Sequence, residues 1–304
     1  MKIAAILTCH NRKEKTLRSL RCLFTSLDVY NAKRNNLQGD TITLTVFLTD
    51  DGCTDGTADA VNQSFPKRQI TIVNGDGNLF WAGGMRKAWR EAIRKEGRVD
   101  FFLLLNDDTF AFPTMLAELL ATHRYCTTEL GKTGIYSGVT CDERDTSIIT
   151  YSGDVFDNQR RLTRLGPSGK PQRVDVTNAN ALLVPQAVVD DIGIFYDGYT
   201  HSCADNDYAI QANRHGHPAL ITAHVCAYCE FDHKDAKNET MKLATMNYAE
   251  RKSYLKHPLH SDPEYLEYIR RNFPKLYPIT WTLRHIRLIC PKLYIKINEL
   301  RGIY

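Results

Sequence analysis

The sequence lacks the segments that would place it in a membrane or outside the cell. No stretch of about 18 residues is free of charge, so a membrane-spanning helix is not expected. The apolar start, residues 1–8, is shorter than a secretory signal core and is not followed by a small-residue cleavage site. Nine cysteines in 304 residues are too few for a disulfide scaffold. These absences predict a cytoplasmic protein with reduced thiols.

Several motifs that define large enzyme classes are also missing. There is no Gly-x-x-x-x-Gly-Lys-[Ser/Thr] phosphate loop and no Gly-x-Ser-x-Gly nucleophile elbow. Gly75-Asp76-Gly77 has no third glycine at dinucleotide-binding spacing. The sequence therefore argues against a P-loop NTPase, an α/β-hydrolase and a dinucleotide-dependent dehydrogenase.

Charge is distributed unevenly along the chain. Residues 270–304 carry eight Lys or Arg and one acid, which gives +7 and leaves −3 for the rest of a chain whose net charge is +4. This basic, aromatic tail predicts an anionic partner surface. No basic stripe with interleaved aromatics occurs in the body, so a nucleic-acid partner is not expected.

The hydrophobic pattern predicts an α/β fold. Short apolar runs at 2–8, 42–49, 70–73 and 101–105 are typical of buried strands, and residues 17–27 and 85–93 have helical spacing. Alternating strands and helices imply a mostly parallel sheet flanked by helices. Residues 236–304 are expected to form helices broken by prolines, so we predict two domains, 1–235 and 236–304.

Three polar clusters follow predicted strand ends, at residues 9–12, 50–55 and 106–108. Ligands of such sheets bind beyond the carboxyl ends of the strands. The clusters are therefore expected to converge on one edge of the sheet.

Two of these clusters allow both a structural and a chemical interpretation. The adjacent carboxylates of Asp107 and Asp108 repel each other unless a cation compensates, and a divalent metal is the usual solution. The alternative is a solvated loop with a helix cap ahead of Pro113. In the same way, the segment 50–57 has two interpretations: either Asp55 or Thr57 simply caps a helix, or Asp50 and Asp51 accept hydrogen bonds from a nucleobase or ribose.

Two later segments also carry chemical side chains. Asp205-Asn206-Asp207-Tyr208 starts a predicted helix, where a carboxylate is either a cap or a general base. Cys226 and Cys229, between His224 and His233, would suit zinc, but one Cys-x-x-Cys without a second pair is weak evidence for it.

In order and spacing, these segments resemble the inverting nucleotide-sugar glycosyltransferases of family two, which have the GT-A fold, and their rhamnosyltransferase-like branch. Residues 8–12 resemble the Thr-Tyr-Asn-Arg opening, and residues 50–57 differ from Asp-Asp-Gly-Ser-Thr-Asp-Gly-Thr only at Cys53. Residues 78–88 look like the nucleotide-holding Asn-x-Gly-x-x-x-Gly-x-Asn segment. Residues 105–108 resemble the metal-binding motif in its Asn-x-Asp form, and residues 205–208 the base motif.

The chain departs from the family pattern at several positions around the donor and the acceptor. Phe80 and Arg86 stand where the family pattern has Gly and Asn. Ala204 replaces the Glu of the base motif, and Gln211 stands where Arg is frequent. The segment Asn178-Ala179-Asn180 occupies the place of the family's Gly before the acceptor loop.

The resemblance implies a fold, a reaction and a role for each motif. The fold is GT-A, a Rossmann-like sheet flanked by helices, here with a C-terminal helical extension. Asp108 is the expected ligand of Mg²⁺ or Mn²⁺, completed by His233 or, second, His224. Asp205 is the expected base and Asp207 its alternative. The implied nucleotide contacts come from Thr8, His10, Asn11, Arg12, Asp50, Asp51, Asn78, Gly84, Arg86 and Asp107.

The implied reaction transfers a sugar from a nucleotide-diphosphate donor to a saccharide or lipid-linked acceptor in cell-surface polysaccharide synthesis. Two other classes stay open: a nucleotidyltransferase-like enzyme and a non-catalytic nucleotide-sugar-binding scaffold. The tail, residues 270–304, is expected either to make a peripheral, salt-sensitive contact with the inner face of the membrane or to pack on the body or on a second copy of the chain in a homo-oligomer.

Overall fold

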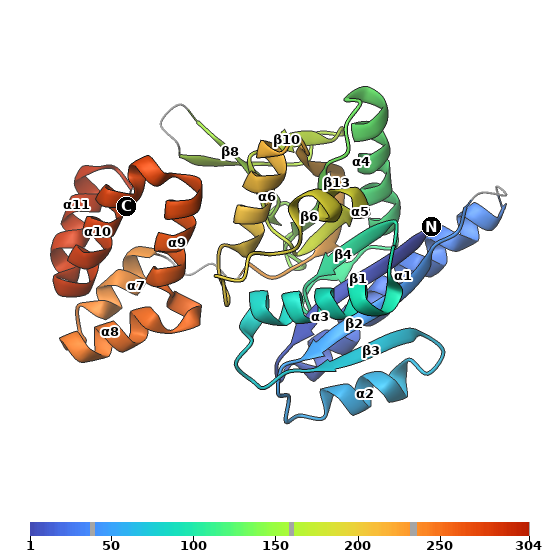
Figure 1. Ribbon diagram of the computed structural model, residues 1–304, viewed down its shortest axis with the longest axis horizontal. Helices are drawn as coiled ribbons and strands as arrows, with labels where there is room; N and C mark the ends of the chain where they lie inside the picture. The colour runs from blue at the N-terminus through green and yellow to red at the C-terminus, as the bar shows by residue number, and fades with distance from the viewer. Residues whose placement is uncertain (37–39, 158–160, 232–235, 304) are drawn as a thin grey trace. The chain divides into compact units, whose positions relative to one another are not determined.

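The computed structural model describes residues 1–36, 40–157, 161–231 and 236–303 (Figure 1). The chain packs into two compact units. The first contains Met1–Tyr196 and Ala204–Phe231, and the second contains Asp197–Cys203 and Asp232–Tyr304. The segment 197–203, which the sequence grouped with the first domain, thus packs with the second unit.

The first unit is built on one large, mostly parallel sheet, as predicted. Its order is β10-β13-β6-β12-β4-β1-β2-β3, with β5 paired to β13 and β7 paired to β6. The strands are β1 (Lys2–Cys9), β2 (Thr43–Asp50), β3 (Gln69–Asn74), β4 (Phe101–Leu105), β5 (Phe110–Ala111), β6 (Ile135–Cys141), β7 (Ile149–Tyr151), β10 (Gln172–Val174), β12 (Ala181–Pro185) and β13 (Ala219–Tyr228). A separate antiparallel sheet joins β8 (Gly153–Phe156), β9 (Leu162–Leu165) and β11 (Val176–Thr177).

Helices cover both faces of the large sheet (Figure 1). They are α1 (Lys13–Asn36), α2 (Thr57–Ser64), α3 (Phe80–Glu96), α4 (Met115–Glu129), α5 (Gln186–Ile192) and α6 (Ala204–Arg214). Side chains alternate between the faces of a strand. Ile3, Ala5 and Leu7 of β1 therefore share a core with α1, α2 and α4, while the remaining face of β1 packs on α3.

The carboxyl ends of the parallel strands meet at one edge, which confirms the predicted convergence. Cys9 of β1 lies beside Asp50 of β2, and Asp50 lies beside Asn74 of β3. Strand β12 runs antiparallel to β4, and Ala181 pairs with Leu105. Residues 178–180, just before β12, therefore reach the same edge as residues 106–108, just after β4.

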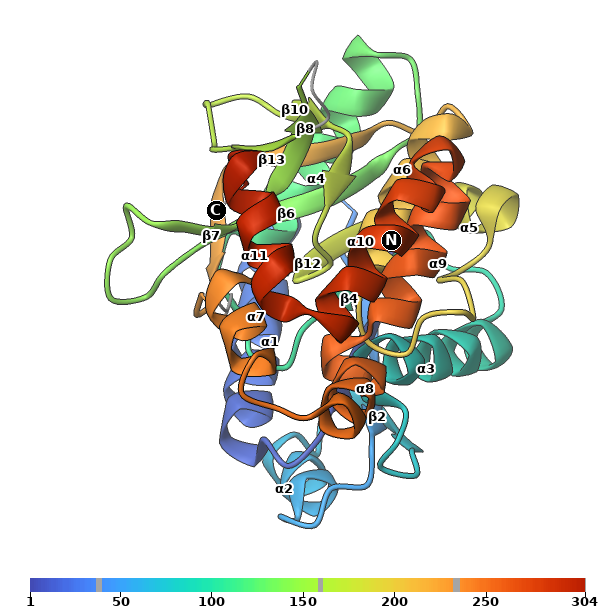
Figure 2. The same ribbon diagram turned by 90° about the vertical axis from the view of Figure 1, so that its left-hand side faces the viewer.

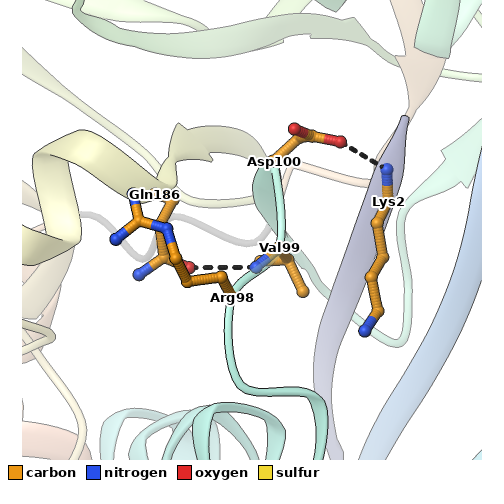
Figure 3. A pocket seen from close by; sticks show the side chains of 5 residues that line it. All are labelled: Lys2, Arg98, Val99, Asp100 and Gln186. Atoms are coloured by element: carbon orange, nitrogen blue, oxygen red, sulfur yellow. Dashed lines mark hydrogen bonds between the residues drawn. The ribbon is translucent and has the colours of Figure 1, made fainter.

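The opposite edge of the sheet carries a shallow cavity of about 260 Å³ (Figure 3). Its charged side chains are paired with neighbours, because Lys2 contacts Glu96 and Arg98 contacts Asp190. Gln186 also accepts a hydrogen bond from the Val99 backbone. These contacts tie the starts of β1 and β4 to α5, so we assign this edge a structural role.

The second unit is helical, as the proline-broken pattern predicts. It contains α7 (Ala236–Leu243), α8 (Tyr248–Lys256), α9 (Asp262–Asn272), α10 (Tyr277–Ile289) and α11 (Pro291–Leu300), with short 3₁₀ turns η1 (Pro258–His260) and η2 (Pro274–Leu276). Prolines occupy first turns, where no backbone donor is lost. Helix α10 contacts α8, α9 and α11 (Figure 2). No helix in the described ranges is long and apolar enough to cross a membrane.

Candidate active site

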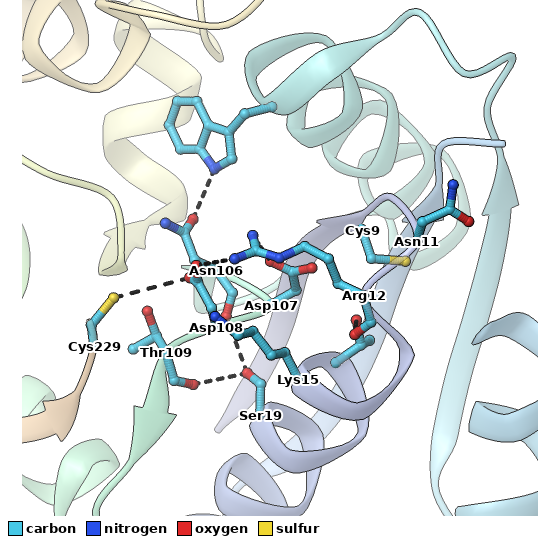
Figure 4. A network of polar contacts seen from close by, with 12 residues as sticks. Cys9, Asn11, Arg12, Lys15, Ser19, Asn106, Asp107, Asp108, Thr109 and Cys229 are labelled. Carbon is cyan, nitrogen blue, oxygen red and sulfur yellow. Dashed lines mark hydrogen bonds and ion pairs between the residues drawn. The ribbon is translucent and has the colours of Figure 1, made fainter. Parts of the chain in front are cut away.

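Arg12 holds together the two adjacent carboxylates that follow β4. Its guanidinium donates to Asp107 Oδ1 at 3.0 Å and to Asp108 Oδ2 at 2.6 Å. Figure 4 shows the arginine reaching from the end of β1 toward both acids. The mutual repulsion of the two carboxylates is thus compensated by the positive charge of Arg12, which lies 95 residues away from Asp107 in the sequence. Arg12 itself is exposed, so an incoming ligand can reach it.

Asp107 is the buried member of this pair. It is 5% exposed, and its Oδ2 has no hydrogen-bond partner within the described structure. Burial raises its pKa to about 7; the neighbouring Arg12 opposes that rise, and Asp108 adds to it. A buried carboxylate oxygen without a donor is costly. The 106–108 loop therefore has an unused acceptor beside the more accessible Asp108.

The loop is held in place by side chains from two helices. The Trp81 indole donates to Asn106 Oδ1 at 2.8 Å, and Ser19 donates to the carbonyls of Asn106 and Thr109. Figure 4 shows Ser19 below the loop that carries Asn106 and Thr109. Trp81 also packs on Phe195, with ring centroids 5.6 Å apart. Sequence reasoning missed Trp81, although it lies within the segment 78–88 that resembles the nucleotide-holding motif.

Asp51 organises the start of α3 rather than facing solvent. Its carboxylate accepts backbone N–H groups of Gly77, Leu79 and Phe80 at 2.9–3.3 Å, and the residue is 3% exposed. A carboxylate near a helix N-terminus satisfies donors that the helix leaves unpaired. Asp51 is thus engaged with backbone, and its contact with a nucleotide stays a prediction.

The neighbouring loops are joined by a second set of polar contacts. The His10 ring lies 2.6 Å from the Asp51 carbonyl, and Asp50 accepts the Cys53 backbone N–H. Asn11, at a φ of 50°, accepts the Thr54 backbone N–H at 2.7 Å. His10 and Asn11 remain exposed at the edge of the sheet. They are therefore accessible to a nucleotide.

Thr8 and Gly84 fix how closely α3 approaches β1. A Cβ on Gly84 would lie 2.1 Å from Thr8 Oγ1, so only glycine fits there. Phe80, where the family pattern has glycine, has a φ of 53°, a conformation that glycine adopts at little cost. The predicted nucleotide-holding segment is therefore the close-packed start of a helix, which presents Asn78 in an exposed turn.

Arg86, where the pattern has Asn, is buried in α3. It is 8% exposed, and its guanidinium donates to the Tyr196 carbonyl at 3.0 Å. This bond ties α3 to the end of the Gly193–Tyr196 segment. The idea that Arg86 reaches a diphosphate stays a prediction.

Asp205 belongs to the same edge of the sheet as Asp107 and Asp108. It accepts the backbone N–H groups of Ala179 at 3.2 Å and Asn206 at 2.9 Å. Asn180 in turn accepts the Asn106 backbone N–H at 3.1 Å. Because β12 runs antiparallel to β4, the residues that precede it connect Asp205, the predicted base, to the loop that carries Asp107 and Asp108.

Burial raises the pKa of Asp205 above its ordinary value, although the hydrogen bonds from Asn206, Ala179 and Asn178 act against that rise. A carboxylate with a raised pKa is a better proton acceptor than an ordinary aspartate. Asp207, two residues later in α6, is 2% exposed. The arrangement suits Asp205 for the base.

The donor set at residues 107–108 fits a hard divalent cation. Two carboxylates, one of which has an oxygen without a hydrogen-bond partner in the described structure, match the preference of Mg²⁺ for one or two carboxylates together with substrate phosphates. Within the described ranges no three His, Cys, Asp or Glu side chains form a metal cluster. His233 lies outside the described residues, and His224 contacts Glu118 at 3.3 Å.

Cys229 lies beside Asp108, but it has the character of a protonated thiol. Its sulfur is 4.0 Å from Asp108 Oδ1 and accepts the Asn180 side-chain amide. Burial raises its pKa to about 12. All nine cysteines are free, and Cys226 is buried against Gly138. These two cysteines therefore do not form a zinc site with other described residues.

Comparison with known families agrees with this geometry. The model of Glycosyl transferase family 2 matches residues 4–164, more than half of the chain. The chain belongs to glycosyltransferase family 2. No curated protein matches the sequence.

Solved structures similar to this glycosyltransferase include TarS from S. aureus. TarS 1–349 in complex with UDP-GlcNAc has a TM-score of 0.57 and 13% identity, over 100% of this chain and 93% of that chain. The same fragment with UDP gives the same values. A longer TarS structure has a TM-score of 0.52 and 15% identity, over 90% of this chain and 44% of that chain. At this identity the likeness shows that the glycosyltransferase shares the fold.

Gly84 gives a direct test of the close approach of α3 to β1. Gly84→Ala should destabilise the glycosyltransferase by about 1–3 kcal/mol, because the new Cβ overpacks against Thr8. Thermal denaturation of the purified variant measures this effect. Gly83→Ala is the control, since its Cβ would meet only Leu79 and Arg86 at ordinary distances. It should be neutral or stabilising by about 0.5–1 kcal/mol. Equal melting temperatures for the two variants would contradict the packing argument.

Proposed function

We propose that this family 2 protein is an inverting, metal-dependent hexosyl- or rhamnosyltransferase. It moves a sugar from a nucleotide-diphosphate donor to a saccharide or lipid-linked acceptor in cell-surface polysaccharide synthesis. The observation that carries this proposal is the connection of Asp205 to the Arg12–Asp107–Asp108 cluster through residues 178–180. A general base and an anion-compensating cluster on one sheet edge are the two requirements of displacement at a sugar C1.

Donor binding rests on the ends of β1 and β4. Asp107 and Asp108 would hold Mg²⁺ or Mn²⁺, with His233 a candidate for completing the site. When bound, the metal supplies Lewis-acid stabilisation of the leaving diphosphate. Arg12 is already placed beside both acids, and its guanidinium suits bidentate binding of a phosphate. Exposed His10, Asn11 and Asn78 surround the same edge and offer hydrogen bonds to the nucleoside.

Asp205 removes the proton of the acceptor hydroxyl as its oxygen attacks C1 of the donor sugar. The C1 bond to the leaving phosphate oxygen breaks on the opposite face, so the anomeric configuration inverts. The Asn206 and Ala179 N–H groups orient the carboxylate. A non-catalytic scaffold would need neither this carboxylate nor its raised pKa, and a nucleotidyltransferase would not use Asp205.

The metal role of Asp108 is testable by binding alone. Asp108→Asn should abolish the dependence of nucleotide-diphosphate binding on Mn²⁺ while the fold is retained, because Asp108 is the more accessible of the two carboxylates. Calorimetry with and without chelator measures the effect. The control is Asp59→Asn, which removes an exposed carboxylate on α2. A variant that responds to chelator as the wild type does would overturn the assignment.

The base assignment predicts a separation of binding from turnover. Asp205→Asn should keep donor affinity and lose about 10²-fold or more in transfer rate. Asp207→Asn is the comparison variant, and activity loss only in that variant would shift the assignment to Asp207. The base works only when it is deprotonated, so in the wild type kcat should fall as the pH is lowered through the pKa of Asp205. That pKa is raised above the ordinary value of 3.8. Measuring kcat against pH with saturating donor tests this limb.

The C-terminal tail, residues 270–304, makes a peripheral membrane contact in this proposal. In α9, Arg270 pairs with Glu267, and in α10, Arg284 and Arg287 pair with Asp262. Four other cations have no ion pair with a described residue: Lys275, Lys292, Lys296 and Arg301. Unpaired cations beside exposed Ile289, Leu293 and Leu300 have the composition of an interfacial segment.

Neutralising these four cations to Gln should remove vesicle binding at low salt. Each cation near an anionic leaflet is worth about 1 kcal/mol, so most of the bound fraction should be lost. Flotation with phosphatidylglycerol vesicles measures it. The control applies the same charge change to four exposed lysines of the first unit: Lys33, Lys67, Lys87 and Lys132. Undiminished binding of the tail variant would show that the tail does not dock on membranes.

A further inference from the structure

A small cavity in the second unit has features that the reaction does not use. It lies among α8, α9 and α10 and has a volume of about 200 Å³. Apolar side chains and polar or charged ones both line it: Leu255, Pro263, Leu266 and Leu288 with Lys252, Lys256, Asp262, Arg284 and His285. It therefore offers an apolar interior next to basic side chains.

The charges around this cavity are unbalanced. Asp262, the one acid among the described residues that line it, accepts Arg284 at 2.8 Å and Arg287 at 2.9 Å. Lys252 and Lys256 lie one turn apart on α8, are exposed, and have no ion pair with any described residue. The cavity is thus net positive and has two cations available.

Acids on the neighbouring helices are already engaged. Glu250 belongs to the capping box of α8, and Glu264 accepts the backbone N–H groups of His201 and Ser202. Glu267 pairs with Arg270, and Glu239 accepts the Tyr254 hydroxyl. None of these carboxylates is left to neutralise the two lysines.

Exposed apolar and aromatic side chains belong to the same elements. Trp281 stacks on His285, which lines the cavity, with ring centroids 3.7 Å apart, and the indole is 44% exposed. Ile289 follows on α10, Tyr248 lies on α8, and Leu259 lies in the turn after it; all three are at least half exposed. Aromatic side chains with basic neighbours are typical of the headgroup level of a membrane.

We propose that this cavity binds the phosphate group of an anionic lipid. The phosphate lies beside Lys252 and Lys256, and the lipid carbons next to it contact Leu255, Leu266 and Leu288. The volume admits a phosphate and a few methylenes but not a whole lipid, so the rest of the lipid remains in the bilayer. Basic pockets between transmembrane helices bind anionic lipid headgroups through the same charge complementarity. The proposal deepens the membrane contact proposed for the tail and rests on it for its biological purpose.

A soluble lipid separates this pocket from general attraction to a charged surface. Short-chain phosphatidic acid below its micelle concentration is titrated into the full chain, and binding is followed by calorimetry and by intrinsic tryptophan fluorescence, to which Trp281 contributes. Saturable binding is expected, and Lys252→Gln/Lys256→Gln should weaken it about thirty-fold, as the loss of two cations worth about 1 kcal/mol each predicts. Lys292→Gln/Lys296→Gln is the matched control, because it makes the same charge change in α11 outside the cavity. It should change the affinity less than twofold.

Two further ligands identify what the pocket recognises. Short-chain phosphatidylcholine carries a zwitterionic headgroup, and inorganic phosphate lacks a chain; neither should saturate the site. The proposal would be overturned if the cavity variant and the α11 control variant lost the same affinity for phosphatidic acid. It would also be overturned if phosphatidic acid and phosphatidylcholine bound equally well. If vesicle flotation fails while soluble phosphatidic acid still binds, the membrane contact is wrong and the pocket assignment stands. Sugar transfer to a soluble acceptor is unchanged by the Lys252 and Lys256 variants in either case.

Discussion

The compensation of two adjacent carboxylates by one guanidinium is the contact on which the site depends. Asp107 and Asp108 follow a fully buried strand, where neither can be surrounded by water on all sides. Arg12 provides the opposing charge from the end of β1, the strand that lies next to β4 in the sheet. The compensation is incomplete, because Asp107 Oδ2 keeps no donor within the described structure. The free protein therefore has both a cation suited to phosphate and an acceptor suited to a metal.

The direction of one strand decides where the predicted base lies. Were β12 parallel to β4, residues 178–180 would lie at the far edge of the sheet. Its antiparallel entry places them beside residues 106–108, and their backbone both donates to Asp205 and accepts from Asn106. Two contacts from α3 support this arrangement: the Trp81 indole donates a hydrogen bond to Asn106, and Gly84 packs closely against Thr8. Precise placement of reacting groups is what the proposed displacement at C1 requires.

In the second unit, ion pairs decide which of the basic side chains keep an uncompensated charge. The sequence indicates only that the tail is strongly basic. In the structure Asp262 neutralises part of α10 internally, whereas Lys252 and Lys256, outside the tail, remain unpaired beside an apolar cavity. The unpaired basic surface of the second unit is therefore broader than the basic run by itself suggests.

The sequence by itself determined the α/β architecture, the broken helices of the C-terminal part and the edge on which the polar clusters meet. Those properties follow from hydrophobic periodicity and from strand ends, which are local features of the chain. The tertiary structure alone decided that Asp51 caps α3, that Trp81 holds Asn106, that Arg86 is buried against Tyr196, and that segment 197–203 packs with the second unit. Such partners lie from 25 to more than 100 residues apart. Their pairing is set by strand order and side-chain packing, and no spacing along the sequence encodes it.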